Sequence, residues 1–545
     1  MLEQSVLLKW ERVLGREYVV TEESRLSQAA TATFAARQQI PAILYPQSRE
    51  QVQDCLRIAS ECSVPVYAIS TGKNWGYGSR VPVSDGCVLM DLGRMNRILE
   101  CSEDLAYVTI EPGVTQQQLW DYLRETGSKL WIDATGSSPD CSLIGNVMER
   151  GFGHTPYGDH ASNVCGLEVV LPNGECLETG FARFPQSNAA AVYRPGLGPS
   201  LDGLFMQSNL GVVTRMTLWL MPRPEYFQAF FFRCDREDGL PNIINALRRL
   251  RLSGTLRSGI HVANDYKILN GIQQYPWKAA GEATPLMPAL MRKLRAEMKF
   301  GAWNGAGALY GTRAQVAEAR RLLRRALKGS VDKLQFLDAS RLSLASRLAG
   351  PLGGIMGWDL SRTLELVRPL FGLMQGVPTD QPLASTYWRK RTAPPADMDP
   401  DRDGCGLMWC SPVAPAEGSH AMVLGELSSE ILLRHGFEPL LSITLDNDRS
   451  LICVISLTYD REVSGEDERA RACFEELEAT LAEKGYVPYR LGIRSMHLMR
   501  CSGAYASLLS AIKKFVDPAD ILAPGRYIAR REPAALGQPG EIERS

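Results

Sequence analysis

The sequence predicts an α+β fold with two domains. A chain of 545 residues exceeds the size at which a single hydrophobic core keeps growing. Its hydrophobic fraction of 45% and charged fraction of 22% are typical of a globular protein. Apolar runs that resemble strands alternate with segments of helical periodicity along most of the chain, which favours mixed secondary structure in both halves.

Residues 1–225 are expected to form the first domain. Its strands are expected at 65–69, 87–92, 106–113 and 211–222. Its helices are expected at 47–63 and 114–127, with a threonine as the N-cap of the second. Residues 165–180 predict a hairpin that turns at Asn173–Gly174. The domain is expected to end near the run 222–224 (Pro-Arg-Pro).

Residues 226–499 are expected to form a second domain of strands and amphipathic surface helices. Strands are predicted at 226–232 and 451–460, and helices at 240–252, 314–328 and 465–484. A loop rich in proline and aspartate, 391–404, interrupts this domain. Residues 305–311 (GAGALYG) resemble a dinucleotide fingerprint, but the third glycine comes one position late. A packed strand of small residues is therefore expected there.

The composition limits the partners of the protein. Lys+Arg total 60 and Asp+Glu total 61, so neither nucleic acid nor an anionic membrane is expected as a partner. The N-terminus lacks the apolar run of a secretory signal, and no stretch approaches the ~20 apolar residues of a membrane span. The 13 cysteines form no CxxC pair and the 6 histidines are dispersed. A reducing, cytoplasmic location and no metal site are expected.

Two glycine-rich loops, 70–82 and 135–160, are the candidate ligand-binding segments. Glycine permits positive φ, and successive backbone N–H groups in such turns form nests that hold anions such as a pyrophosphate. Small hydroxyl residues such as Ser70, Thr71 and Ser142 would add donors. The same composition also suits two surface turns, so the residues alone leave both interpretations open.

Six stretches together resemble the vanillyl-alcohol oxidase and p-cresol methylhydroxylase family of flavoproteins, and they occur in the family's order over nearly the whole chain. They are GKNWGYG (72–78), SLIGNVMERGFGHTPYGDH (142–160), LDGLFMQSNLGVVTRMTLWLMP (201–222), GALYG (307–311), YR (489–490) and ILAPGRY (521–527). The resemblance implies an FAD-binding domain of two α/β subdomains, with its core at about 37–223. It also implies a cap whose antiparallel sheet is flanked by helices, and a segment, 500–545, that returns to the FAD domain.

The resemblance also implies which residues contact FAD. The diphosphate loop corresponds to Ser70, Thr71, Gly72, Lys73 and Asn74. A second flavin-contacting segment corresponds to Ser142, Ile144, Gly145 and Asn146, and Val212 corresponds to a backbone contact on the adenine side. Arg526 would lie near the N1–C2=O edge of the flavin, where a cation stabilises the reduced ring.

Tyr77, Tyr489 and Arg490 match the three phenolate-binding residues of the family. A phenol has a pKa near ~10, and its phenolate releases a benzylic hydride far more readily. An arginine and two hydroxyl donors would make charge-assisted hydrogen bonds to the phenolate oxygen and stabilise the charge that shifts as the hydride leaves. Without the motif around Tyr77, two core tyrosines and a structural ion pair would explain the same residues.

The chain departs from the family at two positions beside the expected cavity. His154 replaces a tyrosine, where it would donate to the substrate, act as an acid or base, or serve a structural role. Ser137 occupies the position of the acid/base aspartate of the oxidases. Asp133 and Asp140 lie nearby and would replace that aspartate only if the loop shifted.

The usual covalent link to flavin is also missing. Leu407 stands at the position of the histidine or tyrosine that forms the link, so non-covalent FAD is expected. Cys141 is the alternative, since other members of the wider superfamily attach flavin through sulfur there. Lys73, however, replaces their companion histidine, and a buried thiol is the other interpretation of Cys141.

The resemblance therefore implies an FAD-dependent oxidoreductase that moves a hydride from a para-substituted phenol, or a phenol-like small molecule of secondary metabolism, to flavin N5. Two alternatives stay open: oxidation of a hydroxy acid or aliphatic alcohol, and a flavin-binding protein without catalysis. The resemblance also implies a homodimer. It leaves the electron acceptor open among O2, a quinone and a separate acceptor protein such as a cytochrome.

Overall fold

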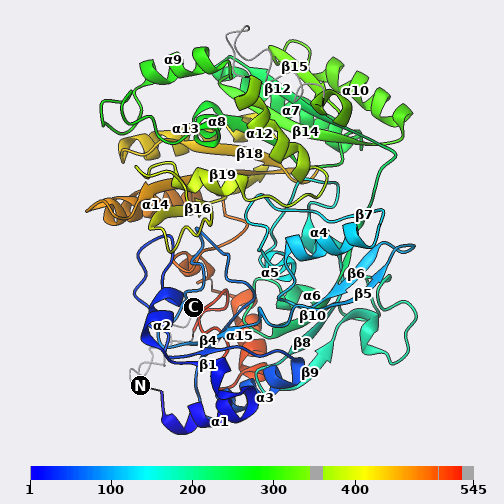
Figure 1. Ribbon diagram of the computed structural model, residues 1–545, viewed down its shortest axis with the longest axis vertical. Helices are drawn as coiled ribbons and strands as arrows, with labels where there is room; N and C mark the ends of the chain where they lie inside the picture. The colour runs from blue at the N-terminus through cyan, green and yellow to red at the C-terminus, as the bar shows by residue number, and fades with distance from the viewer. Residues whose placement is uncertain (1, 344–359, 501, 531–545) are drawn as a thin grey trace, which may run out of the picture.

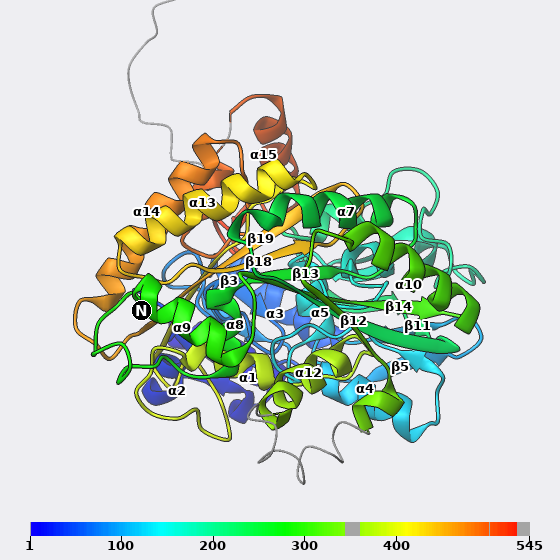
Figure 2. The same cartoon turned by 90° about the horizontal axis from the view of Figure 1, so that it is seen from above.

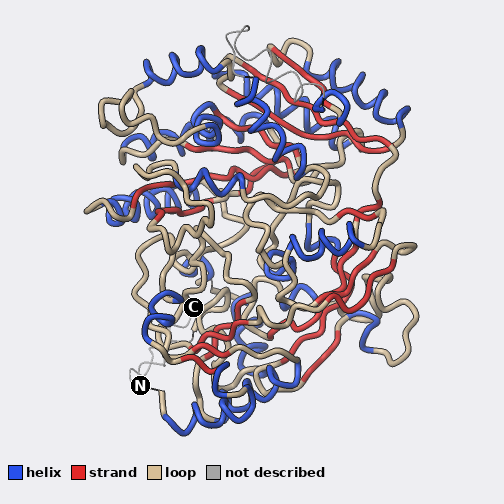
Figure 3. The backbone as a smooth tube through the Cα atoms, viewed as in Figure 1, coloured by secondary structure: helices blue, strands red, loops and turns tan. Residues whose placement is uncertain are grey.

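The computed structural model describes residues 2–343, 360–500 and 502–530. Figure 1 shows two bodies stacked along the long axis: the first domain below, and the cap around one large sheet above. The tube in Figure 3 shows helices and strands in both bodies, which confirms the predicted α+β class. Among the described helices, none combines the length and the apolarity that crossing a bilayer requires.

The first domain begins with a four-stranded sheet. Its strands, in sheet order, are β1 (Val19–Val20), β2 (Ile43–Leu44), β4 (Val88–Asp91) and β3 (Val66–Ile69). The helices of this region are α1 (Gln4–Leu14), α2 (Glu23–Ala29) and α3 (Arg49–Glu61). Trp10 of α1 and Leu56 of α3 are fully buried in one core with Val66. β3 therefore has a fixed position, and the loop that follows it starts from a rigid strand.

A five-stranded antiparallel sheet completes the first domain. Its strands, in sheet order, are β5 (Ile98–Ser102), β6 (Tyr107–Ile110), β10 (Val212–Trp219), β8 (Val164–Val170) and β9 (Cys176–Glu178). Its helices are α4 (Gln116–Glu125), α5 (Leu143–Met148) and α6 (Asp202–Phe205), and β7 (Leu130–Trp131) pairs with β11 (Met221–Pro222). The predicted hairpin is confirmed, because β8 and β9 are antiparallel and Gly174 has φ +78°. The predicted cap is also confirmed: the Thr115 side chain accepts from the Gln118 N–H.

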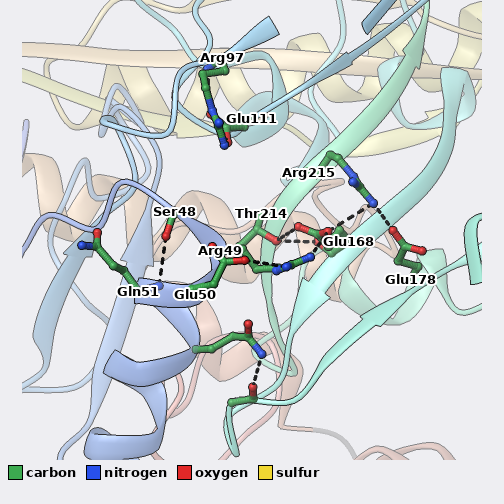
Figure 4. Close-up of polar contacts among 12 residues, drawn as sticks. Ser48, Arg49, Glu50, Gln51, Arg97, Glu111, Glu168, Glu178, Thr214 and Arg215 are labelled. Carbon is green, nitrogen blue, oxygen red and sulfur yellow. Dashed lines mark hydrogen bonds and ion pairs between the residues drawn. The ribbon is translucent and has the colours of Figure 1, made fainter. Parts of the chain in front are cut away.

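A buried carboxylate joins the two sheets of this domain (Figure 4). Glu168 of β8 is 6% exposed and accepts a hydrogen bond from Thr214 Oγ1 at 2.8 Å. It also pairs at 3.3 Å with Arg49 of α3 and at 3.3 Å with Arg215 of β10. Because two arginines neutralise it, the carboxylate ties the helix of the first sheet to the strands of the second.

The cap is built on an eight-stranded antiparallel sheet. Its path is β15 (Lys333–Leu337), β12 (Tyr226–Cys234), β14 (Trp303–Gly311), β13 (Ile260–Asn264), β18 (Leu440–Leu445), β19 (Ser450–Asp460) and β16 (Cys405–Cys410), with β17 (Val413–Pro415) also on β19. Its helices are α7 (Leu240–Leu252), α8 (Asp265–Ile272), α9 (Pro288–Met298), α10 (Arg313–Leu327), α12 (Leu360–Leu373), α13 (Gly418–Arg434) and α14 (Glu466–Glu483). Figure 2 shows α7, α10, α13 and α14 above the sheet, and their buried residues form one core with it.

The GAGALYG segment is a packed strand, as predicted. It forms residues 305–311 of the nine-residue strand β14 and is paired along its length with β12. A Cβ on Gly305 would lie 2.0 Å from the Phe232 ring, and one on Gly307 would lie 2.6 Å from the Phe230 ring. The glycines therefore make room for aromatic side chains of the neighbouring strand, so they serve packing and no nucleotide.

The last described segment returns to the first domain. Helix α15 (Ala504–Val516) lies beside the lower body in Figure 1. Beyond it, Ala523 N–H donates to Val66 O at 2.7 Å, next to β3. The buried Lys513 ammonium donates to Asp517 at 2.6 Å and to the Asn209 carbonyl at 2.8 Å. These bonds fix the segment against β3, and Arg526, three residues after Ala523, has its guanidinium 6.0 Å from the ring centroid of Tyr67 in β3.

Candidate active site

A cavity of about 820 Å³ is lined by residues of both the first domain and the cap. Its walls are the loops after β3 and before α5, the start of β10, and the face of the cap sheet that α7 and α13 do not cover. Every residue that the sequence predicts for cofactor binding or catalysis lies in these walls. They are Ser70, Thr71, Gly72, Lys73, Asn74, Tyr77, Ser142, Ile144, Gly145, Asn146, His154, Val212, Tyr489, Arg490 and Arg526.

The two glycine-rich loops are joined at the cavity. The Ser142 N–H donates to Thr71 Oγ1 at 3.1 Å. A Cβ on Gly145 would lie 2.3 Å from Ser70 Oγ, so a larger residue does not fit there. Ser142 is the N-cap of α5: its hydroxyl donates to the Pro112 carbonyl at 2.6 Å and accepts from the Gly145 N–H. The expectation that the Ser142 hydroxyl is a free donor for a ligand was therefore wrong, since its proton is already used.

Arg490 and the two tyrosines meet in one wall of the cavity. The Arg490 Cζ lies 4.4 Å from the ring centroid of Tyr77, and its Nη2 donates to Asn74 Oδ1 at 2.5 Å. Tyr489 precedes Arg490 in the chain, and its hydroxyl interacts electrostatically with both Tyr77 and Arg490. The Tyr77 oxygen is 3.3 Å from Ser411 Oγ at the end of β16. Three segments far apart in the sequence thus place a guanidinium and two phenol groups together.

The sequence reasoning missed the carboxylate that holds this group in place. Glu149 accepts from Arg526 Nη2 at 2.5 Å and from the Tyr527 hydroxyl at 2.7 Å, and it lies 3.5 Å from Arg490 Nε. Burial acts to raise the pKa of this carboxyl, but Arg526 and Arg490 together outweigh burial and lower it. Glu149 is therefore ionised at neutral pH. Glu149 falls inside the quoted motif 142–160, but nothing in the sequence names its three partners.

Burial keeps both tyrosine hydroxyls protonated. It raises the pKa of Tyr77 well above the ordinary value, and Tyr489 adds to the shift while Arg490 opposes it. Burial likewise raises the pKa of Tyr489, against the effect of Arg490. Two neutral hydroxyls beside a permanent cation are hydrogen-bond donors, so this wall of the cavity is suited to an anionic oxygen.

Comparison with known proteins places this geometry in a family. Residues 40–180 match a family model described as FAD binding domain. The 1'-carboxy-chondrochloren decarboxylase of Chondromyces crocatus is 46% identical over 97% of this chain and 98% of its own. The flavoprotein subunit of 4-cresol dehydrogenase [hydroxylating] of Pseudomonas putida is 32% identical over 95% of this chain and 94% of its own length.

This chain belongs to the p-cresol methylhydroxylase family of flavoproteins. It is an FAD-dependent oxidoreductase. Two solved structures agree in fold, each with a TM-score of 0.86 over 96% of this chain. One is p-cresol methylhydroxylase with substrate bound, at 31% identity over 96% of that chain. The other is an isoeugenol complex of 4-ethylphenol oxidase from Gulosibacter chungangensis, at 30% identity over 97% of that chain.

The cavity wall of this family member fits FAD. Ser70 and Gly145 pack closely where the two loops meet at the cavity, and Gly72 has φ +70°, a conformation that suits a turn able to hold an anion. Arg526 Nη1 is buried and has no hydrogen-bond partner among the described residues. An acceptor atom of a bound flavin would satisfy it, since an unpaired buried donor is unfavourable. The residues that would hold the cofactor are Ser70, Thr71, Gly72, Lys73, Asn74, Ser142, Ile144, Gly145, Asn146, Val212 and Arg526.

Two histidines form a second feature of the cavity, on its cap side. The rings of His154 and His261 lie 4.6 Å apart between centroids. His261 Nδ1 is 3.1 Å from Thr444 Oγ1, whereas His154 Nδ1 and His261 Nε2 have no hydrogen-bond partner among the described residues. Burial lowers the pKa of both, and for His261 the proximity of His154 adds to the effect. Both imidazoles are therefore neutral at pH 7 and offer unpaired nitrogens to a ligand. His261 belongs to no recognisable motif.

Neither candidate replacement for the family's acid/base aspartate reaches the cavity. Asp133 is buried, and its carboxylate is used by His160 Nε2 at 2.9 Å and by two backbone N–H groups. Asp140 is exposed. Neither aspartate lines the cavity, whereas Ser137 does, together with Thr135, Gly136 and Cys141 of the same loop.

Proposed function

We propose that this protein removes a hydride from the benzylic carbon of a para-substituted phenol or a phenol-like molecule. The observation that carries this proposal is the guanidinium of Arg490 beside the hydroxyls of Tyr77 and Tyr489 in the cavity. A free phenol is neutral at pH 7, because its pKa is about 10. The three donors would lower that pKa, and each unit corresponds to about 1.4 kcal/mol of preferential stabilisation of the phenolate.

The phenolate is the reactive form because its oxygen supplies the electrons that replace those leaving with the hydride. FAD, when bound, accepts the hydride and its two electrons. The residues of this chain hold the oxygen end of the substrate. Glu149 keeps Arg490 in position before the substrate arrives, so little reorganisation accompanies the reaction. The organic product of this step is a quinone methide whose carbonyl oxygen keeps the same three donors.

The more similar of the two full-length relatives is a decarboxylase by name, which supports a carboxylated substrate for this chain. Loss of CO2 is compatible with the same first step, since a quinone methide accepts the electrons that a departing carboxylate leaves behind. The absence of an acid/base aspartate beside Ser137 also favours an outcome that requires no activated water.

We also propose that the FAD is bound non-covalently. Leu407 is 1% exposed, lies in the cavity wall and has no nucleophilic atom. Burial raises the pKa of the Cys141 thiol, which disfavours the thiolate that a flavin link needs. Acid precipitation of the purified protein should leave the yellow colour in the supernatant. Flavin that stays with the denatured protein would contradict this proposal.

Anaerobic mixing tests the proposed reaction. 4-Ethylphenol should bleach the flavin absorbance in a single turnover, whereas 1-butanol and lactate should not. Bleaching by lactate or the aliphatic alcohol alone would favour oxidation of a hydroxy acid or alcohol. No bleaching with any compound, in protein that retains FAD, would indicate a flavin-binding protein without catalysis.

A further inference from the structure

A lysine lies in the cap wall of the cavity without an opposite charge. Lys267 extends from α8, and its Nζ donates to Ser456 Oγ at 3.1 Å and to Asn270 Oδ1 at 3.4 Å. It lies 5.4 Å from the ring centroid of Trp409. No carboxylate oxygen of the described residues lies within 4.0 Å of this ammonium group. Burial alone lowers its pKa to about 8.

The two lysines that are fully buried in the described chain are matched by carboxylates. Lys390 pairs with Asp460 at 2.9 Å and Glu462 at 2.7 Å, and Lys513 pairs with Asp517 at 2.6 Å. A buried cation without a partner is unfavourable. Lys267 differs from Lys390 and Lys513 in one further respect, because it lines the cavity. A ligand in the cavity is therefore able to supply the missing negative charge.

The surroundings of Lys267 are polar on the side that faces the cavity. Ser442 and Thr444 of β18 and His261 of β13 line the same wall, and His261 stands opposite Thr444 in the sheet register. These side chains are neutral donors or acceptors, so they add hydrogen bonds without competing with Lys267 for an anion.

Trp409 connects Lys267 with the phenol-binding wall. A Cβ on Gly76 would lie 2.0 Å from Trp409 Cδ1, so the indole packs directly on the backbone next to Tyr77. Lys267 lies near the same indole. Both groups open into one cavity. A single small molecule is therefore able to place a phenol oxygen at Tyr77 and an anionic group at Lys267.

We propose that Lys267 binds a carboxylate on the para side chain of the substrate, so that the preferred substrates are phenols with an anionic tail. This inference rests on the proposed hydride removal from a phenol. With the carboxylate on the carbon next to the benzylic one, the chemistry balances. A hydride, which carries two electrons, leaves the benzylic carbon for FAD and gives the quinone methide. The C–CO2 bond then breaks, its electron pair restores the aromatic ring, and the products are CO2 and an alkenylphenol.

Binding is tested with a ligand that cannot react. 4-Hydroxycinnamate has a carboxylate at the required distance and no sp3 benzylic hydrogen, and its methyl ester is the neutral match. Calorimetry on the FAD-loaded protein should show that Lys267→Met raises the Kd of 4-hydroxycinnamate by about tenfold or more relative to the Kd of its methyl ester. Lys267→Arg should restore part of this preference. Lys278→Met, at an exposed lysine of the cap, is the matched control and should leave the ratio of the two Kd values unchanged.

The reaction is tested with 3-(4-hydroxyphenyl)propanoate, which should give 4-vinylphenol and CO2 in an anaerobic single turnover. An equal loss of affinity for acid and ester in Lys267→Met would overturn the role of Lys267. Oxidation of the acid without CO2 release would overturn the decarboxylation step. If 4-ethylphenol and the acid both fail to bleach the flavin of the wild type, the proposed function fails. If 4-ethylphenol bleaches the flavin but Lys267→Met leaves the preference for the acid over the ester unchanged, only the inference about the carboxylate fails.

Discussion

The two ends of the cavity differ in how their charges are balanced. At the Arg490 end, Asn74 and Glu149 hold the guanidinium, and Glu149 also binds Arg526. At the Lys267 end, the ammonium has only amide and hydroxyl partners. Both side chains are partly buried, so a difference in exposure class does not explain the contrast. A charge that the protein already neutralises keeps its geometry without a ligand, whereas an unmatched charge gains most when the ligand brings the opposite one.

The largest effect on the rate of flavin reduction is expected at the Arg490 end of the cavity, where the guanidinium would contact the substrate. Arg490→Ala removes the only permanent cation among the three phenol-binding groups, and loss of one such donor costs about 10²–10³ in rate. Stopped-flow reduction with 4-ethylphenol should slow by at least that factor, while the absorbance spectrum shows that FAD is retained. An unchanged rate of flavin reduction would remove the argument for a phenolate site.

Variants that change the charges at the two ends of the cavity should differ in thermal stability. Glu149→Gln leaves two buried arginines without their carboxylate, and breaking such a pair costs about 3–5 kcal/mol. Its melting temperature should fall clearly below that of the wild type in thermal unfolding. Lys267→Met removes a buried charge that has no partner, so its melting temperature should not fall. Equal losses in the two variants would mean that the ends are not balanced differently.

The pH dependence should sharpen the contrast. Burial lowers the pKa of Lys267 to about 8, so the ammonium is present below that pH and is lost above it. The affinity for 4-hydroxycinnamate relative to its methyl ester should be constant below about pH 7 and fall by about tenfold per unit above pH 8. Both ligands carry the phenol group, so its ionisation affects the two Kd values alike and does not change their ratio. Lys267→Met should give a flat profile, and a wild-type profile that is also flat would contradict the assignment.

The smallest effect is expected from one neutral donor of the balanced end. Tyr77→Phe removes a single hydroxyl and leaves Arg490 and Tyr489, so flavin reduction by 4-ethylphenol should slow by about tenfold. The measurement is the limiting rate in anaerobic stopped flow. A loss as large as that of Arg490→Ala would mean that the Tyr77 hydroxyl does more than donate one hydrogen bond to the phenolate.

Much of the fold could be predicted from local patterns. The strand at 65–69, the Thr115 cap and the hairpin at Asn173–Gly174 depend on residues next to one another, and the structure has each of them. The glycines of β14 were also correctly interpreted as packing residues, although the phenyl rings that require them come from β12. Local sequence suffices where a few neighbouring residues determine the backbone.

The sequence by itself predicted the residues of the proposed phenol-binding wall, because Tyr77 and Arg490 lie in recognisable motifs, and the structure brings them together. Only the tertiary structure decided which charges are paired. Glu149 meets Arg490 across 341 positions of sequence, as their numbers show (490 − 149), and Lys267 finds no carboxylate at all among the described residues. Charge pairing depends on distance and burial in three dimensions, and no periodicity or spacing along a chain encodes either quantity.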